Sequence, residues 1–113
     1  GVLGQLMQMQ GPDGDLVARA LDLFEKHSRT AAKRLATAVQ SGAGPEISSA
    51  AHALKSMSVN VGAMSLGAAC GAVERAGDAP EKLSVLMKAV RTEYIKTHKA
   101  LPKIRETYAR SAA

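Results

Sequence analysis

Apolar residues recur at steps of three and four along most of this chain, which is the spacing that places them on one face of an α-helix. The first long stripe runs from Leu16 to Ala38, and charged residues occupy the opposite face. We expect this helix to stop at residues 41–44, where two glycines permit a left-handed cap. Its predicted inward positions are Leu16, Ala20, Leu23, Phe24, His27, Ala31, Leu35 and Ala38.

Two shorter stripes follow the first. Pro45 and Glu46 suit the first turn of a helix, and Gly62 is expected to end that helix or bend it. Gly67 and Gly71 lie inside the next helix, where we expect their small size to let a neighbouring helix approach. The inward positions of the helix that begins at Pro45 are Ile47, Ala51, Leu54, Ser58 and Val61. Those of the helix that contains Gly67 and Gly71 are Leu66, Ala69, Cys70, Val73 and Ala76.

The last stripe is the longest. Asp78 is expected to cap its helix with Glu81 three residues on, and Pro102 predicts a kink or break because proline removes a helical hydrogen bond. The inward positions are Leu83, Met87, Val90, Tyr94, Thr97, Leu101, Ile104 and Tyr108. No strand-like alternation occurs, and short turns between helices imply antiparallel neighbours. The chain is therefore predicted to be all-α: one domain over residues 1–113, an up-down antiparallel four-helix bundle with a short N-terminal helical cap at residues 1–10.

Composition narrows the class of protein. The chain has 113 residues with 3% aromatic residues and no Trp, so small and aliphatic side chains must fill the core. One cysteine excludes an internal disulfide, and no apolar run is long enough to cross a bilayer. With no recognisable leader either, we expect a cytoplasmic protein with no membrane partner.

The net charge of +5 and the pI near 9.7 suit an acidic partner. Basic residues gather between Lys88 and Arg110, which indicates either a solvated helix face or, less simply, a nucleic-acid surface. The stretch lacks interleaved aromatic residues and a helix-turn-helix pattern. We therefore expect no nucleic-acid partner.

Three histidines are candidates for chemistry. His27 falls on an apolar stripe and is expected to be a core or boundary residue, whereas His98 stands between lysines and is expected at the surface. Cys70 and Glu74 with one distant histidine do not have the spacing of a zinc site, and Cys70 is expected to be a small core residue. The phosphate-binding glycine loop and the nucleophile-elbow motif are both absent. We expect no intrinsic cofactor, no metal and no ATP-dependent kinase activity.

His52 differs from the other two because helical geometry turns it about 160° away from the buried side of its own helix. Lys55 lies one turn along the same helix. The predicted exposed arc around the histidine is made of Ser48, Ser49, Ser56 and Val59. Such a surface of small side chains lets another protein come close to the imidazole.

This stretch resembles the histidine-containing phosphotransfer (HPt) domains of multistep phosphorelays. Residues 46–77 carry the resemblance, and Ser56 stands where many members have glycine. Ala63 and Cys70 favour the phosphorelay branch over the chemotaxis-kinase branch of these domains. The matching positions are His52, Leu54, Lys55, Ser56, Ser58, Asn60, Gly62, Ala63, Leu66, Cys70 and Glu74.

The resemblance implies that His52 accepts a phosphoryl group from the aspartate of a receiver domain and passes it to another receiver. Lys55 would stabilise the charge of that group, while Mg²⁺ would sit on the partner. The partner would be a response regulator receiver domain or a hybrid sensor histidine kinase, and the domain would act as a monomer. Docking is assigned to Ser48, Ser49, Ser56, Val59 and Gly62.

Two other functions remain open at this point. A helical module that docks response regulators without chemistry would need the same surface but not the histidine. A basic bundle that binds nucleic acid would use the last helix instead. Either would leave His52 without a chemical role.

Overall fold

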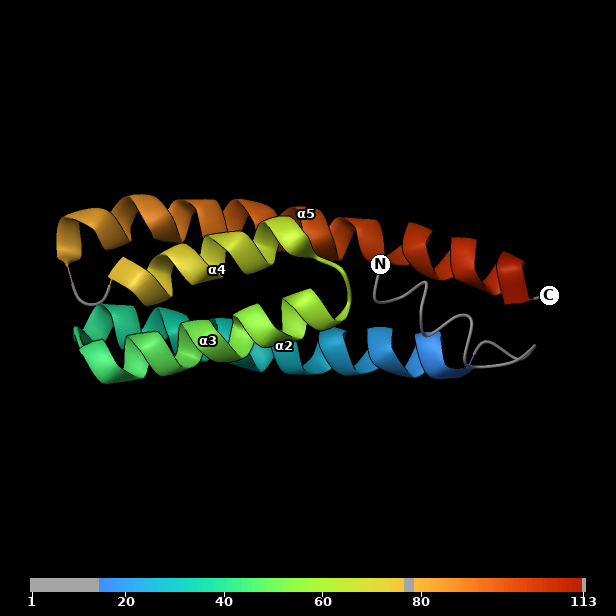
Figure 1. The fold of residues 1–113 in the computed structure, drawn as a ribbon, viewed down its shortest axis with the longest axis horizontal. Coiled ribbons are helices and arrows are strands. Elements are labelled where there is room, and N and C mark those ends of the chain that lie inside the picture. Colours follow the sequence, from blue (N-terminus) through green and yellow to red (C-terminus); the bar gives the residue numbers. More distant parts are fainter. Residues whose placement is uncertain (1–14, 77–78, 113) are drawn as a thin grey trace.

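The computed structural model describes residues 15–76 and 79–112, which form four helices (Figure 1). They are α2 (Asp15–Ser41), α3 (Gly44–Asn60), α4 (Met64–Ala76) and α5 (Pro80–Ala112). No strand occurs in these two ranges. The predicted cap at residues 1–10 and the predicted Asp78 cap lie outside the described residues.

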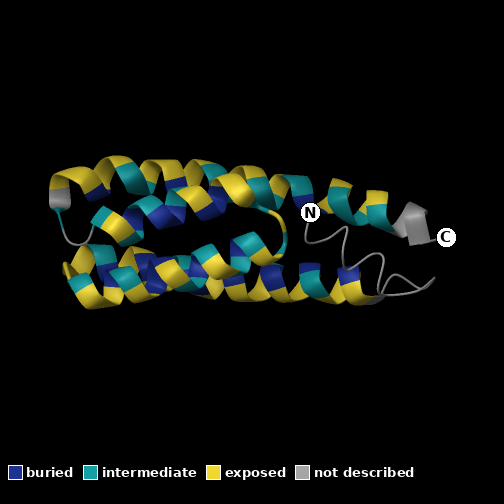
Figure 2. Ribbon diagram, in the orientation of Figure 1, coloured by how far each residue is buried: buried dark blue, intermediate teal, exposed yellow. Residues whose placement is uncertain are grey.

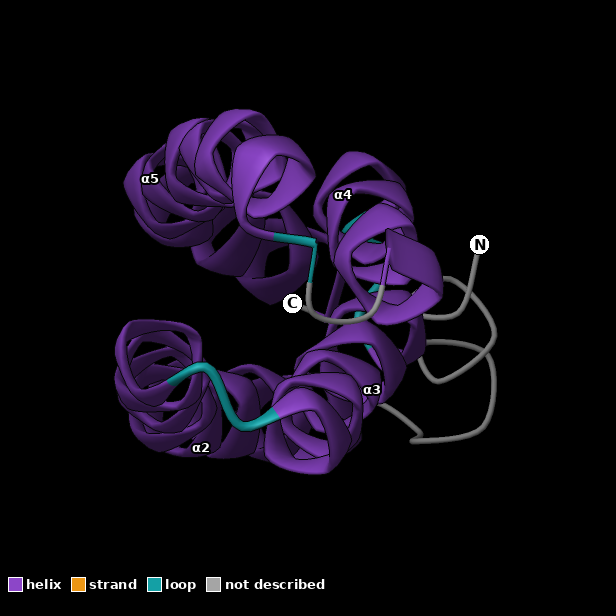
Figure 3. Cartoon of the chain, turned by 90° about the vertical axis from the view of Figure 1, so that its left-hand side faces the viewer, coloured by secondary structure: helices purple, strands orange, loops and turns teal. Residues whose placement is uncertain are grey.

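The helices pack as an up-down bundle, as predicted. Each contacts its neighbours in sequence, and α2 also contacts α5, so the four form a square when viewed along the bundle (Figure 3). Helices α2 and α5, with 27 and 33 residues, are much longer than α3 and α4, with 17 and 13. They continue past the turn between α3 and α4, so one end of the molecule contains only two described helices (Figure 1).

Glycine makes both described turns possible. Gly42 has φ of 69° and Gly62 has φ of 81°, a left-handed conformation that other residues rarely adopt. The Ala63 amide donates to the Ser58 carbonyl at 2.8 Å, which closes the end of α3. Both predicted helix ends, at residues 41–44 and at Gly62, are therefore confirmed.

The core contains the predicted inward positions of α3, α4 and α5. Leu54, Leu66 and Cys70 are completely buried, and Leu83, Val90 and Leu101 nearly so. The remaining predicted positions on α5 are half-buried along the same face (Figure 2). The three- and four-residue steps of these helices therefore located the packed faces correctly.

The predicted inward positions of α2 are only partly confirmed: Phe24, Ala31, Leu35 and Ala38 are buried as predicted, but the first turns of the helix face inward through other residues. Its buried stripe contains Val17, Leu21 and Ser28, whereas Leu23 is 56% exposed and His27 is exposed. Apolar residues are adjacent at 16–17, 20–21 and 23–24, so the apolar arc is broad and the sequence alone does not fix which edge faces inward. The prediction that His27 is a core or boundary residue was wrong.

His98 is half-buried against α2, contrary to its predicted surface position. Its ring centroid lies 4.2 Å from that of Tyr94 and 5.8 Å from that of Phe24, and its Nε2 shares a hydrogen bond of 3.2 Å with Ser28 Oγ. Burial lowers the pKa of His98, and the nearby Arg29 charge lowers it further, while Glu25 acts in the opposite direction. The flanking lysines suggested an exposed turn, but His98 is four residues after Tyr94 on the packed side of α5.

Pro102 does not break α5, which continues to Ala112. The preceding residue, Leu101, is buried, while Pro102 itself is exposed. Packing of the helix on both sides of the proline therefore holds it together despite the loss of one backbone hydrogen bond.

Candidate functional site

His52 lies on the solvent-facing side of α3, with 63% of its side chain exposed. Ala50, Ala51 and Leu54 are completely buried, so packing on the core fixes the rotation of this helix about its axis. That rotation turns the imidazole outward. A partner protein has direct access to the ring.

Glu74 of α4 contacts the imidazole. The Nδ1–H of His52 donates to Glu74 Oε1 at 3.1 Å and to Oε2 at 3.3 Å. An ionised carboxylate only accepts hydrogen bonds, so this contact places the proton of a neutral imidazole on Nδ1. The other ring nitrogen, Nε2, is then left with a free electron pair.

Lys55 completes a cluster drawn from two helices. Its Nζ lies 3.9 Å from Glu74 Oε2, and its side chain is 41% exposed. One carboxylate therefore faces both the imidazole and the ammonium group. The arrangement presents a nucleophilic nitrogen and a nearby cation on the same side of the molecule.

Glycine in α4 lets α3 and α4 come this close. A methyl group at Gly67 would lie 3.0 Å from Val59 Cγ2 and 3.8 Å from the Lys55 carbonyl oxygen. A methyl group at Gly71 would meet the Lys55 side chain at 3.8 Å. The predicted use of a small residue is confirmed at Gly67, whereas the distance at Gly71 is an ordinary contact with α3.

The predicted docking residues do not form one uniform exposed surface. Ser49, Ser56 and Gly62 are exposed, whereas Ser48 is half-buried and Val59 is half-buried against Gly67. The predicted exposed position of Val59 was therefore wrong, because α4 approaches α3 at this point.

Ser49 is already engaged within the protein. Its hydroxyl accepts a hydrogen bond of 2.8 Å from Arg34 Nη2 of α2, and Arg34 also pairs with Glu46. The hydrogen bond from Arg34 lowers the pKa of the Glu46 carboxyl. This contact ties α2 to the first turns of α3, just before His52.

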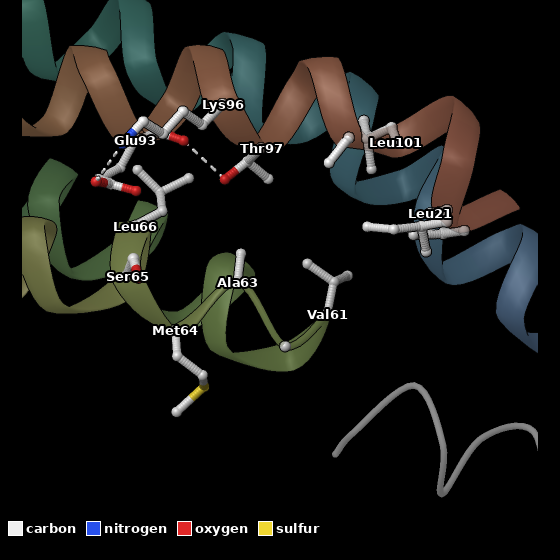
Figure 4. Close-up of a pocket in the computed structure, with 13 residues that line it drawn as sticks. Leu21, Val61, Ala63, Met64, Ser65, Leu66, Glu93, Lys96, Thr97 and Leu101 are labelled. Carbon is white, nitrogen blue, oxygen red and sulfur yellow. Dashed lines mark hydrogen bonds and ion pairs between the residues drawn. The ribbon is translucent and has the colours of Figure 1, made fainter. Parts of the chain in front are cut away.

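Gly62 lies away from this cluster, on a groove beside the turn between α3 and α4. Ala63, Met64 and Leu66 form one side of the groove, and Thr97 and Leu101 of α5 lie on the other (Figure 4). Glu93 and Lys96 stand at its edge and pair with each other at 3.8 Å (Figure 4). Neither His52 nor Lys55 lines this groove, so the structure does not bring all the predicted site residues together.

Other kinds of site have less support. In residues 15–76 and 79–112, no three His, Cys, Asp or Glu side chains converge in a way that could hold a metal ion. None of the described helices is long and apolar enough to span a membrane. Cys70 is buried, and burial raises the pKa of its thiol to about 11, so it is poorly suited to nucleophilic chemistry.

Glu74 is the site residue to which the sequence analysis gave no role. It was matched only as an acidic position in the motif, four residues after Cys70. The available signal was geometric, since a residue one turn beyond an inward Cys70 lies at the edge of the packed face, where it can reach a neighbouring helix.

Comparison with protein families adds an independent finding. A family model described as "Hpt domain" matches residues 19–104. The match includes most of α2, all of α3 and α4, and most of α5. Comparison with curated proteins and with solved structures gave no significant match.

Proposed function

Because the chain belongs to the Hpt domain family, which takes part in histidine phosphotransfer in phosphorelays, we propose that His52 is its phosphoryl carrier. The group would come from the aspartate of a receiver domain and pass to a second receiver domain. The single observation that carries this assignment is the hydrogen bond from His52 Nδ1 to Glu74 on an exposed helix face. It leaves Nε2 available on the side that a partner can reach.

In the proposed step, the electron pair of Nε2 attacks phosphorus, and the bond between phosphorus and the aspartyl oxygen breaks. The aspartate leaves as a carboxylate, and the imidazole ring gains positive charge. Glu74 stabilises that charge because its carboxylate already accepts the Nδ1 proton. The reverse reaction, with a second aspartate as acceptor, uses the same contacts.

Lys55 supplies a positive charge near the incoming group. Phosphoryl transfer depends on in-line positioning and on compensation of charge on the equatorial oxygens. Its ammonium group sits beside Glu74, one helical turn from His52. Resemblance to the family implies that Mg²⁺ and further charge compensation come from the receiver, so this domain supplies one half of the reacting site.

The partner would be a response regulator or the receiver domain of a hybrid sensor kinase, and one copy of this bundle would suffice for the reaction. Ser56 and Ser49 flank His52 on the exposed face and would lie under the docked receiver. Docking of such a partner requires no cofactor on this chain. We place the reaction in the cytoplasm, in line with the family.

The test is phosphoryl transfer from a radiolabelled receiver in the presence of Mg²⁺, with His52→Gln as the matched variant. We expect wild type to gain one alkali-stable, acid-labile phosphate and the variant to gain none. If both proteins bind the receiver but neither is labelled, the chain is a docking module rather than a carrier. Labelling of the variant would place the carrier on another residue.

The role of Lys55 has a separate test. Lys55→Ala should lower the transfer rate about fivefold, which is the effect expected from loss of one partly exposed charge. Its thermal midpoint should stay close to that of wild type, since the ammonium group is not part of the core. Equal transfer rates would show that Lys55 is only a solvated lysine.

A further inference from the structure

Arg75 brings a second cation to the place where α4 packs against α3 beside Lys55. A methyl group placed on Gly71 would lie 3.2 Å from Arg75 Nη1 and 3.8 Å from both Cδ and Cε of Lys55. The guanidinium and the lysine side chain therefore meet above the same bare stretch of α4 backbone.

The direction of the Arg75 side chain explains this position. Helical side chains lean toward the N-terminus of their own helix, so Arg75 folds back over Gly71, one turn earlier in α4. This backward lean brings the guanidinium to Gly71, where the Lys55 side chain of the antiparallel helix α3 also lies. With a methyl group at residue 71, the guanidinium would have to shift by a few tenths of an ångström.

The guanidinium is also available for a ligand. Arg75 is exposed and, among the described residues, forms no ion pair or hydrogen bond. Glu74, its neighbour in sequence, faces His52 and Lys55 instead. An unpaired guanidinium offers a planar set of donors that matches phosphate oxygens.

The net charge of the cluster around His52 indicates what the Arg75 guanidinium could bind. Lys55 is balanced by the carboxylate of Glu74, so these two residues together offer no net positive charge to an incoming phosphoryl group. A phosphoryl group adds negative charge beside that carboxylate. Arg75 can supply a further cation from this chain, because its guanidinium lies over Gly71, where the Lys55 side chain also lies.

We propose that Arg75 binds the phosphoryl group on His52 together with Lys55, and that the absence of a side chain at Gly71 makes room for its guanidinium. This inference rests on the function proposed above. It assigns Arg75 to the reacting group itself rather than to docking or to the stability of α4.

The first test compares Arg75→Gln with Arg91→Gln, a matched loss of charge at an exposed position on α5. Phosphorylation of His52 is measured with two donors, a phosphorylated receiver and the small molecule phosphoramidate. At saturating donor, where long-range attraction does not limit the rate, Arg75→Gln should slow labelling about fivefold with both donors, and Arg91→Gln should slow neither. Equal rates for the two variants would overturn the inference. A loss seen only with the receiver would also overturn it, since the arginine would then contact the partner.

The second test removes no charge. In Gly71→Ala the new methyl group crowds Arg75 Nη1, while its distance of 3.8 Å from Lys55 is an ordinary contact. We expect slower labelling, with a smaller loss than in Arg75→Gln because the cation is displaced and not removed, and no lower thermal midpoint, because alanine favours the helix. Adding Gly71→Ala to Arg75→Gln should cause no further loss. Full additivity, or wild-type rates for Gly71→Ala, would overturn the role of Gly71 in placing Arg75.

These outcomes separate the two proposals. Wild type that is never labelled would refute the carrier function and this inference together. Labelled wild type with an unaffected Arg75→Gln variant would refute this inference alone and leave His52 as the carrier.

Discussion

At the scale of single residues, the chemistry of His52 depends on a neighbour that is distant in sequence. Glu74 fixes the protonated nitrogen of the ring and lies close to the charge that develops during transfer. Replacing it by alanine should lower the transfer rate about tenfold, since a hydrogen bond to a charged group contributes roughly 1.5–3 kcal/mol and part of this is lost to solvent. The measurement is the rate of labelling of His52 by a phosphorylated receiver.

Glu74→Gln provides the control for this prediction. The glutamine amide oxygen still accepts the Nδ1 proton, so the orientation of the ring is kept while the charge is lost. Its rate should lie between those of wild type and Glu74→Ala. A Glu74→Ala variant as fast as wild type would show that the carboxylate neither orients the ring nor stabilises its charge.

His98 makes a second residue-scale prediction, which concerns stability. It lies among Phe24, Ser28, Glu25 and Arg29 of α2 and Tyr94 of α5, and burial holds its pKa below the ordinary value of 6.5. The unfolded chain therefore binds a proton at higher pH than the folded protein does. Stability should be fully present above pH 6.5 and should fall as pH drops from there through the lower pKa of the folded protein.

Thermal unfolding between pH 7.5 and pH 5.5 measures this effect. The midpoint of wild type should fall across the window, and that of His98→Gln should fall less because glutamine does not titrate. Equal slopes for the two proteins would contradict the prediction.

The histidines also show how far sequence reasoning reaches at this scale. The position of His52 on the exposed side of α3 follows from Ala51 and Leu54, because only one face of that helix is apolar. His27 and His98 were misplaced because their local surroundings gave the wrong signal: an apolar arc in one case and two lysines in the other. The contact between His52 and Glu74 joins two helices, and local periodicity carries no information on such a pairing.

At the scale of helices, the approach of α3 to α4 is set by Gly67. A methyl group there would lie 3.0 Å from the branched Val59 side chain, with the α3 backbone behind it. Gly67→Ala should therefore destabilise the protein by about 1–3 kcal/mol through overpacking, offset by about 1 kcal/mol from the better helix propensity of alanine. Urea unfolding measures the net loss, and His52 should also lose its contact with Glu74.

A second substitution tests that mechanism. Val59→Ala in the Gly67→Ala background removes the branch that the new methyl group meets, so the double variant should regain part of the lost stability. If Gly67→Ala is as stable as wild type, α3 and α4 can accommodate the methyl group, and Gly67 does not set the distance between them.

Helix boundaries were more predictable than helix rotation. Helices α2 and α3 end at Gly42 and Gly62 as expected, because the chain leaves each helix through a residue with positive φ, and glycine adopts that conformation readily. The rotation of α2 was less well predicted because apolar pairs such as Leu16 with Val17 leave two possible inward edges. Pro102 was expected to kink or break α5; it does not break the helix, whose neighbouring turns are packed, and the kink stays a prediction.

At the scale of the whole molecule, the net charge of +5 should act on association rather than on chemistry. A receiver presents a phosphorylated aspartate, so long-range attraction increases the rate of encounter with a basic carrier. Raising NaCl from 50 mM to 500 mM should lower kcat/KM for transfer about tenfold as the field is screened. The rate at saturating receiver should change much less, since charges buried beneath a docked partner are screened less than exposed ones.

Substitutions far from His52 test whether the attraction of the receiver comes from the charge of the whole molecule or only from the cations near His52. Arg91 and Lys99 are exposed on α5, which is not among the helices that pack against α3. Reversing both to glutamate lowers the net charge from +5 to about +1 without altering the docking face. If the positive charge of the whole molecule attracts the partner, kcat/KM of the double variant should be lower than that of wild type at 50 mM NaCl and equal to it at 500 mM. If the double variant equals wild type at both salt concentrations, attraction comes from the cations beside His52, and the basic face of α5 is only a solvated helix surface.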